Sequence, residues 1–281
     1  MTNPRYYLEN YHIVKTKNDG FKTLYPFWDS QEIIYSEIMG LLAVGKPAKI
    51  LIDKARQLGS STLSEGLIFH HTIFTEANNT LIVAQDPGQA DYLFSMSMLA
   101  FKNLPWWLQP MVLYRSKGRY LVLGSEIPGM TGLNSEIFVE AANKLSGVSV
   151  GKTIHCAHLS ELSSWDNAKI LTEQIFPAMS GNNVIAILES TARGRNGFWY
   201  DFWCESIESW GEEDWEWKPV FVEWFRCREY SVPIENKAAF ELTEEETAIR
   251  AKIQNASDYT IPDEQFNWRR IKRKETIKIT G

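Results

Sequence analysis

Short apolar runs rich in β-branched residues, each bounded by turn residues, recur along the chain and predict buried β-strands. The strands predicted in this way are residues 49–52, 80–84, 120–123, 154–159, 184–188 and 220–225. Between them, apolar residues follow helical spacing in residues 31–42, 62–75 and 89–101. Because strands alternate with helices, we expect an α/β fold with a mostly parallel sheet that is covered by helices on both faces.

The functional residues of such a sheet are expected where its strands end. Right-handed crossovers bring the carboxyl ends of parallel strands to one edge, and ligands bind outside that edge. The residues that directly follow the strands at 49–52, 154–159 and 184–188 are therefore the first candidates for a site.

The first strand leads into Ala-Arg-Gln-Leu-Gly-Ser-Ser-Thr, residues 55–62, where a helix begins. A strand, a glycine turn and a helix N-terminus predict an anion site, because free backbone N–H groups and the helix dipole both face the ligand. A standard phosphate-binding loop has a lysine at the position of Ser60. Arg56 can bring a planar guanidinium to the same phosphates, and Lys54 is the second choice. Taken alone, a Ser/Thr-rich helix cap explains this stretch equally well.

The strand at 154–159 ends in Ser160 and Glu161. Nucleotide hydrolases place acids at this point to handle Mg²⁺ and to polarise the attacking water. Ser160 stands where an aspartate is usual, so Glu161 is the remaining carboxylate at the strand tip. The alternative for an isolated glutamate at a strand end is a solvent-facing position without a function.

Two further segments fit the same chemistry. The strand at 184–188 is followed by the small polar tip Glu189, Ser190, Thr191 and Ala192, which suits the sensing of a γ-phosphate. Upstream, Trp28 and Gln31 open the first long helix. A glutamine amide can donate to and accept from adenine, and an aromatic neighbour can stack on the base.

Composition limits the class of protein. The chain has 281 residues, of which 44% are hydrophobic and 23% are charged, and such a chain can bury a core. No apolar run reaches the length of a membrane span, and no export signal opens the chain, so we expect a soluble, cytosolic protein. Cys156, Cys204 and Cys227 form no C-x-x-C pair, which suits a reducing compartment. The histidines near Cys156 lack the spacing of a structural zinc site.

Charge and aromatic residues change towards the C-terminus. The net charge is −6, yet the end of the chain is basic. Its basic residues are Arg269, Arg270, Lys272, Arg273, Lys274 and Lys278. This tail could contact DNA phosphates without sequence preference or form the solvated start of a following domain, and we weigh the two equally. The aromatic stripe of Trp199, Trp203, Ile207 and Trp210 predicts a helix packed on the sheet, and residues 205–216 predict a solvated acidic face.

In order along the chain, these motifs resemble the ATPase domain of the large terminase subunit of tailed bacteriophages, from about Pro26 to Arg270. The motifs are Tyr-Pro-Phe-Trp-x-x-Gln at 25–31, Arg-Gln-x-Gly-x-Ser-Thr at 56–62, Ser-Glu at 160–161 with Trp165 beyond, Ser-Thr-Ala-x-Gly at 190–194 and Trp-Arg-Arg at 268–270. The resemblance implies a three-layer P-loop NTPase fold of the RecA/ASCE-like type. It also implies a motor that hydrolyses ATP with Mg²⁺ to translocate double-stranded DNA into a procapsid.

Carried over by position, the resemblance implies a role for each motif. Trp28 and Gln31 would hold adenine, and Arg56 would bind the phosphates and assist catalysis. The phosphate cradle would consist of Gln57, Leu58, Gly59, Ser60, Ser61 and Thr62. Ser61 and Ser160 would contact Mg²⁺, partly through water, and Glu161 would be the catalytic carboxylate. Ser190, Thr191 and Ala192 would couple hydrolysis to movement of DNA.

The resemblance further implies an assembly. Such motors act as rings on a portal protein with a small terminase subunit, in the host cytoplasm and away from any membrane, and are monomeric in isolation. One subunit offers a basic residue to its neighbour's nucleotide. The candidates are Lys144, Lys152, Arg193 and Arg195, of which we favour Lys152. Residues 1–235 would form the motor domain, and residues 236–281 a linker or lid that leads to an absent nuclease domain, so DNA cleavage is not expected here.

Two other functions stay open. A different DNA-translocating ATPase of the helicase type would normally keep the loop lysine and an Asp-Glu pair, and Ser60 and Ser160 count against it. A degenerate, non-hydrolysing nucleotide-binding scaffold is favoured by the same two replacements. Nucleotide binding that does not depend on Arg56 would support the scaffold.

Overall fold

The structure is a computed structural model that describes residues 3–16, 19–116, 119–145, 151–179, 181, 183–257 and 259–280. The side chain of Lys278 in the basic tail lies outside this description. The chain divides into two compact units, Met1–Val222 and Glu223–Gly281. The second unit thus begins ahead of the boundary at 235–236 that the sequence suggested.

The first unit contains a mixed sheet of eight strands in the order β10-β3-β9-β8-β4-β7-β6-β5. The strands are β3 (Ala48–Lys54), β4 (Asn79–Ala84), β5 (Val112–Ser116), β6 (Tyr120–Leu123), β7 (Ser135–Ala141), β8 (Cys156–Ser160), β9 (Ile185–Ser190) and β10 (Trp217–Val222). The strands from β10 to β7 are parallel, whereas β6 and β5 are antiparallel. The predicted α/β class with a mostly parallel sheet is confirmed.

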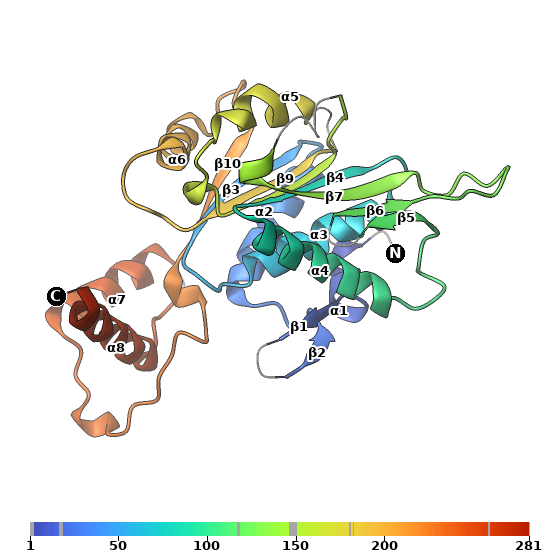
Figure 1. Ribbon diagram of the computed structural model, residues 1–281. Coiled ribbons are helices and arrows are strands. Elements are labelled where there is room, and N and C mark those ends of the chain that lie inside the picture. The colour runs from blue at the N-terminus through green and yellow to red at the C-terminus, as the bar shows by residue number, and fades with distance from the viewer. Residues whose placement is uncertain are drawn as a thin grey trace. The chain divides into compact units, whose positions relative to one another are not determined.

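Helices cover both faces of this sheet (Figure 1). One face is covered by α1 (Pro4–Asn10), α2 (Asp29–Ala43), α3 (Ser60–Phe74) and α4 (Pro87–Asn103). The other is covered by α5 (Phe176–Ala178) and α6 (Phe198–Ser209), together with the short helical segments η2 (Leu162–Ser164) and η3 (Leu171–Ile175), which precede α5 in the chain. A further 3₁₀ turn, η1 (Ala142–Lys144), follows β7, and β1 (Ile13–Lys15) pairs with β2 (Phe21–Thr23) in a separate hairpin.

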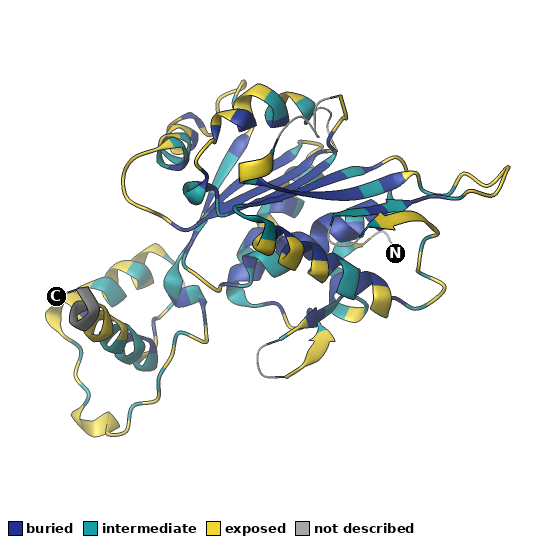
Figure 2. Cartoon of the chain, in the orientation of Figure 1, coloured by how far each residue is buried: buried dark blue, intermediate teal, exposed yellow. Residues whose placement is uncertain are grey.

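The central parallel strands form the core of the first unit and are almost entirely buried (Figure 2). Leu51 on β3 is the Cα partner of Leu188 on β9, and Leu81 on β4 is the partner of Ala157 on β8. All four are fully buried. Helices on both faces exclude water from the strands, which explains why they read as continuous apolar runs.

Two strands of the eight-stranded sheet escaped sequence prediction, as did the hairpin strands β1 and β2. The strand β7 lies between β4 and β6, but Glu136 and Glu140 interrupt its apolar run. These two acids pair with Lys152 and Arg119, respectively. The strand β5 lies at the sheet edge and is largely exposed, so it lacks a buried apolar pattern. The predicted strand at 220–225 is shifted, because β10 begins at Trp217 and ends at Val222.

The prediction that one aromatic stripe of α6 packs on the sheet is only partly correct. Trp199 is buried in the main apolar cluster, and Trp203 packs against that cluster together with Phe202. Ile207 is 55% exposed and Trp210 is 37% exposed. Trp199 and Trp203 therefore face the core, whereas Ile207 and Trp210 do not, and the buried positions of the C-terminal half of α6 are Ser206 and Ser209.

The second unit contains η4 (Trp224–Arg226), η5 (Lys237–Ala239), α7 (Glu244–Ala256) and α8 (Asp263–Thr280). Phe225, Ile261 and Phe266 form its small core. The basic tail forms part of α8, and three of its arginines bind acids of α7: Arg269 Nη2 lies 2.7 Å from Glu245 Oε1, Arg273 Nη1 lies 3.1 Å from Glu245 Oε2, and Arg270 binds Glu246. These arginines are therefore neutralised within the unit, which neither expectation for the tail foresaw.

No helix in the described part of the chain is both long enough and apolar enough to cross a membrane.

Candidate functional site

A cavity of about 490 Å³ opens at the carboxyl ends of the parallel strands, beside the N-terminus of α3. Five residues predicted for the site line it: Arg56, Gln57, Ser61, Ser160 and Glu161. Lys54, Gln85, Gln89, Tyr92, Leu93 and Arg193 also line it. The structure therefore brings the glycine loop and the Ser-Glu tip together around one cavity, as expected for the carboxyl ends of parallel strands.

Local backbone geometry shapes the glycine loop. Gly59 has a φ of 73° in the left-handed region and is the N-cap of α3, and Gln57 has a φ of 59°. Left-handed backbone is readily adopted by glycine but is strained for glutamine. The first hydrogen bond of α3 runs from Leu63 N to Gly59 O at 3.1 Å. The backbone amides that precede Leu63 at the start of α3 therefore have no partner within the helix and can bind a ligand.

The start of α2 holds this loop from behind. Ser30 Oγ donates to Leu58 O at 2.6 Å, and Gln31 Nε2 donates to Gly59 O at 3.1 Å. Gln31 Oε1 in turn accepts from Trp28 N at 2.9 Å. Gln31 is only 3% exposed, and neither it nor Trp28 is among the residues that line the cavity. In this structure the two residues expected at adenine support the loop.

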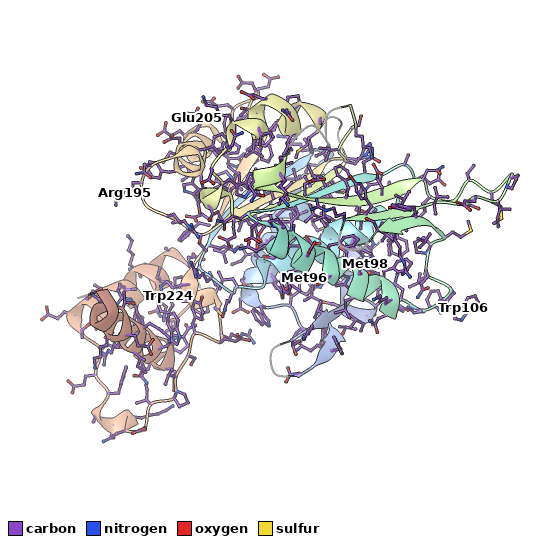
Figure 3. The ribbon with its side chains drawn as sticks, viewed as in Figure 1. Met96, Met98, Trp106, Arg195, Glu205 and Trp224 are labelled. Atoms are coloured by element: carbon purple, nitrogen blue, oxygen red, sulfur yellow. The ribbon has the colours of Figure 1, made fainter. Side chains whose placement is uncertain are left out.

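Leu58 and Thr62, two other members of the expected cradle, point elsewhere. Leu58 is buried. Thr62 lines a second, smaller cavity of about 200 Å³ together with Met96 of α4. Figure 3 labels Met96. Tyr92 lines both cavities.

A fully buried glutamate, Glu189, lies beneath the cavity at the end of β9. Ser60 Oγ donates to its Oε2, and Ser61 Oγ donates to its Oε1. Ser160 Oγ donates to the same Oε1 at 3.3 Å. The sequence analysis grouped Glu189 with the polar tip suited to γ-phosphate sensing and did not foresee its burial. The signal that could have found it is a charged residue that directly continues an apolar strand.

Glu189 belongs to a buried network of charges. His158 Nε2 lies 3.2 Å from Glu189 Oε1, and His158 Nδ1 lies 2.6 Å from Glu65 Oε1. Lys54 Nζ lies 3.9 Å from Glu189 Oε2 and 3.8 Å from Glu161 Oε1. Each ring nitrogen of His158 thus lies close to a carboxylate, and two nearby negative charges favour the protonated imidazole.

The pKa values follow from this arrangement. Burial opposes the charged form of His158, but its hydrogen bonds to Glu189 and Glu65 outweigh burial and raise its pKa to about 9. Burial would likewise raise the pKa of Glu189, yet the charge of Lys54 and the hydrogen bond of His158 hold that pKa well below its usual range. For Glu65 burial prevails and raises the pKa, although His158 opposes the shift.

Glu161 occupies a strained turn at the tip of β8. Its φ is 58°, which is uncommon for a residue with a side chain and is typical of functional sites. Its carboxylate is partly exposed towards the cavity and accepts from Thr191 Oγ1 at 3.4 Å. Trp165 Nε1 donates to Ser160 O at 3.1 Å, which anchors the turn. Glu161 therefore lines the cavity, with Thr191 and Lys54 beside its carboxylate.

The expected coupling residues are bonded to the turn that follows Glu161. Ser190 Oγ donates to Ser163 Oγ at 2.7 Å, and Ser163 Oγ donates to Thr191 O at 2.9 Å. Ala192 is exposed and adds no polar side chain. The tip of β9 and the Glu161 turn therefore form one hydrogen-bonded unit.

The four basic candidates lie in different places. Arg193 lines the cavity, and Arg195 is exposed on the loop between β9 and α6 (Figure 3). Lys144 is exposed in η1. Lys152 Nζ lies 2.5 Å from Glu136 Oε1 at the start of β7, so it lies at the amino ends of the strands. Lys152 is thus at the sheet edge opposite the cavity of its own chain.

Oxygen atoms predominate among the groups that could hold a cation. Ser61, Ser160 and Glu161 present hydroxyl and carboxylate oxygens to the cavity, and Mg²⁺ binds one or two carboxylates with waters and phosphates. The donor set therefore fits this ion. The described residues contain no cluster of three or more His, Cys, Asp or Glu side chains that could hold a metal by themselves.

No protein-family model and no curated protein matches this sequence. Solved structures do match it. The large terminase of bacteriophage HK97 is 17% identical over 92% of this chain and 53% of its own, with a TM-score of 0.59. A mutant of the large terminase ATPase domain of Thermus phage P74-26 is 19% identical over 67% of this chain and 84% of its own, with a TM-score of 0.51.

The large terminase of a thermophilic bacteriophage, solved in complex with ADP, is 12% identical over 70% of this chain and 45% of its own, with a TM-score of 0.51. The chain thus spans about half the length of this protein and of the HK97 protein. Identities this low establish similarity of fold. With its eight-stranded mixed sheet and its helices on both faces, the chain has the P-loop NTPase fold of bacteriophage large terminase ATPase domains.

Proposed function

We propose that this chain is the ATPase motor of a DNA-packaging terminase, which hydrolyses ATP with Mg²⁺ to move double-stranded DNA into a procapsid. The observation that carries the proposal is the convergence of the glycine loop, Lys54 and the Ser160-Glu161 tip on one cavity. Its fold is that of terminase ATPase domains, and a structure with this fold, the terminase of the thermophilic bacteriophage, holds ADP.

Two basic residues would replace the missing loop lysine. Arg56 and Lys54 both line the cavity at the loop. Lys54 is 8% exposed, and its ammonium lies between the carboxylates of Glu161 and Glu189. A desolvated ammonium interacts strongly with phosphate because little water screens it. We therefore assign phosphate binding to Arg56, Lys54 and the amides at the start of α3.

Ser61 and Ser160 would hold Mg²⁺ with the phosphates and, partly, through water. When bound, this ion supplies positive charge that neutralises the β- and γ-phosphates. Glu161 would orient and deprotonate the attacking water, since its carboxylate is held at the cavity by Thr191 and Lys54. Ser190 and Thr191 would report the state of the site to the turn at Ser163.

The partners follow from the same proposal. The motor would act in the host cytoplasm as a ring on the portal, with the small terminase subunit and double-stranded DNA. Of the basic candidates, Arg193 lies at its own chain's cavity, whereas Lys152 lies at the far sheet edge. A role for Lys152 would therefore be in a neighbour's site. Nuclease activity is not assigned to the described fold.

Calorimetric titration with a slowly hydrolysed ATP analogue and Mg²⁺ tests the proposal. The parent chain should bind saturably, and Arg56→Ala and Lys54→Ala should each weaken binding by about tenfold or more. Arg115→Ala is the matched control, because Arg115 is an exposed arginine on the edge strand β5.

Three results would change the proposal. Unchanged affinity in both Arg56→Ala and Lys54→Ala would place the phosphates elsewhere and would support a degenerate nucleotide-binding scaffold. Absence of binding by the parent chain would remove the enzymatic assignment. Weaker binding in Arg115→Ala as well would indicate a nonspecific effect of charge.

A further inference from the structure

This inference rests on the proposed function and concerns the charge at its metal site. Ser160 stands where nucleotide hydrolases usually have an aspartate, and Glu161 is the one carboxylate among the described residues that line the cavity. The tip of β8 therefore carries one carboxylate where an Asp-Glu pair would carry two, and the Lys54 ammonium lies 3.8 Å from that carboxylate. The buried Glu189 has no part in the proposed chemistry.

We propose that Glu189 supplies the missing charge from the neighbouring strand and acts through the hydroxyls of Ser61 and Ser160. The sheet register places it for this role, because Ser160 on β8 and Glu189 on β9 are direct Cα partners. The carboxylate that would be expected on β8 is thus present on the same rung of the sheet, one strand away.

Hydrogen-bond direction makes the hydroxyls suitable ligands. Ser61 Oγ and Ser160 Oγ both donate to Glu189 Oε1. A hydroxyl has one hydrogen and two lone pairs, so a serine that donates to Glu189 keeps its lone pairs for an ion in the cavity. A charged acceptor behind a ligand also increases the electron density of that ligand, which is how outer-shell carboxylates tune metal affinity.

The surroundings hold Glu189 in one orientation. Its side chain is 0% exposed. His158 Nε2 lies 3.2 Å from its Oε1, and the other ring nitrogen of His158 faces Glu65. Glu65 in turn accepts from Ser97 Oγ of α4 at 3.2 Å. Glu189 is therefore a positioning residue that acts through the two serines, and its carboxylate does not contact the ligand.

The test separates charge from shape. Glu189→Gln keeps the size and a carbonyl oxygen that accepts from the serines, but it removes the negative charge. Affinity for the slowly hydrolysed ATP analogue is measured by calorimetry with Mg²⁺ and with EDTA, and Mn²⁺ binding in the presence of the analogue is measured by electron paramagnetic resonance. In Glu189→Gln we expect affinity in EDTA close to that of the parent, and at least about tenfold weaker Mn²⁺ binding.

The decisive variant restores a negative charge at the end of β8. Ser160→Asp with Glu189→Gln should recover most of the Mn²⁺ affinity, because the carboxylate then stands where nucleotide hydrolases usually have it. Glu140→Gln is the matched control, since Glu140 is also a buried acid near the end of a parallel strand but lies outside the cavity. Ser160→Ala covers the case in which Glu189→Gln does not fold, and it should weaken Mn²⁺ binding while Glu189 remains in place.

The inference would be overturned if folded Glu189→Gln, or Ser160→Ala, bound Mn²⁺ with the affinity of the parent. The proposed function would then remain intact. A double variant no better than Glu189→Gln would assign Glu189 a structural role only. A parent chain that binds no nucleotide in either condition would instead remove the proposed function, and the inference with it.

Discussion

Glu161 and Gly59 show how single backbone conformations set the site. Both residues have φ near +60 to +75°, but for different reasons. Gly59 turns the chain from β3 into α3 without the steric cost of a side chain. Glu161 accepts that cost, and its turn is held by the hydrogen bond of Trp165 to Ser160 O. The left-handed conformation places its carboxylate beside Thr191 and Lys54.

Replacement of Glu161 by glutamine should leave nucleotide affinity nearly unchanged and lower the rate of hydrolysis by about 100-fold or more. The amide keeps the shape of the side chain but cannot accept a proton from water. The measurement is phosphate release by the chain as assembled for packaging. Glu173→Gln, at an exposed acid of η3, is the control, and equal rates in Glu161→Gln and the parent would exclude Glu161 from the mechanism.

Gly59→Ala should lower the free energy of unfolding by about 1–2 kcal/mol through its left-handed backbone alone, with a further loss from a clash. A Cβ at this position would lie 2.8 Å from Gln31 Nε2. Gly45→Ala is a close control, because Gly45 has a φ of 72° with no atom within 4 Å of its Cβ position. Urea unfolding should show the larger loss for Gly59→Ala, and equal losses would mean that Gln31 does not restrain the loop.

At the scale of elements, α7 begins with a reciprocal cap. Thr243 Oγ1 accepts from Glu246 N at 3.2 Å, and Glu246 Oε2 accepts from Thr243 N at 2.9 Å. The same carboxylate binds Arg270 of α8. The hydrogen bond from Arg270 is the main reason that the pKa of Glu246 is lowered to about 2. One acid thus fixes the start of α7 and joins it to α8.

Glu246→Gln should therefore destabilise the second unit by about 1–3 kcal/mol, because it replaces a charged acceptor that bonds both Thr243 and Arg270. Hydrogen exchange of the α7 amides measures this loss. Glu244→Gln lies in the same first turn but is exposed, and it should have a small effect. Exchange in Glu246→Gln as slow as in the parent would contradict the role of this acid.

At the scale of the whole first unit, stability should depend on a buried histidine that does not line the cavity at the strand ends. His12 is 1% exposed, and its Nδ1 lies 3.2 Å from Tyr7 Oη. Burial, and then the charge of His70, lower its pKa to about 3. The folded protein therefore holds His12 neutral, whereas the unfolded chain binds a proton below about pH 6.5. This contribution to stability is complete above pH 6.5 and is lost as the pH falls towards about 3.

Between pH 7 and pH 5 the parent chain should lose about 2 kcal/mol of unfolding free energy through His12. His12→Asn has an amide that does not titrate in this range, so its free energy of unfolding should fall less over the same interval. Urea unfolding at both pH values gives the comparison. Parallel losses in parent and variant would show that His12 is protonated in the folded state.

Local patterns in the sequence were sufficient for much of this protein. The central strands, the helices around them and the glycine turn at residues 55–59 follow from apolar periodicity and from the conformational freedom of Gly59, both of which act between near neighbours. The same patterns located Arg56, Ser61, Ser160 and Glu161, which all line the cavity.

Contacts between distant segments decided the rest. The strand β7 was not predicted because its apolar run contains two acids, which pair with Lys152 and Arg119 in the structure. The contact between Lys54 and Glu189 exists only because β3, β8 and β9 lie side by side in the sheet. Gln31 became a support for Gly59 through a contact between α2 and the loop. A pattern along one segment reports burial and local conformation, whereas the partners of a charged or polar side chain depend on which strands lie side by side, and only the tertiary structure determines that order.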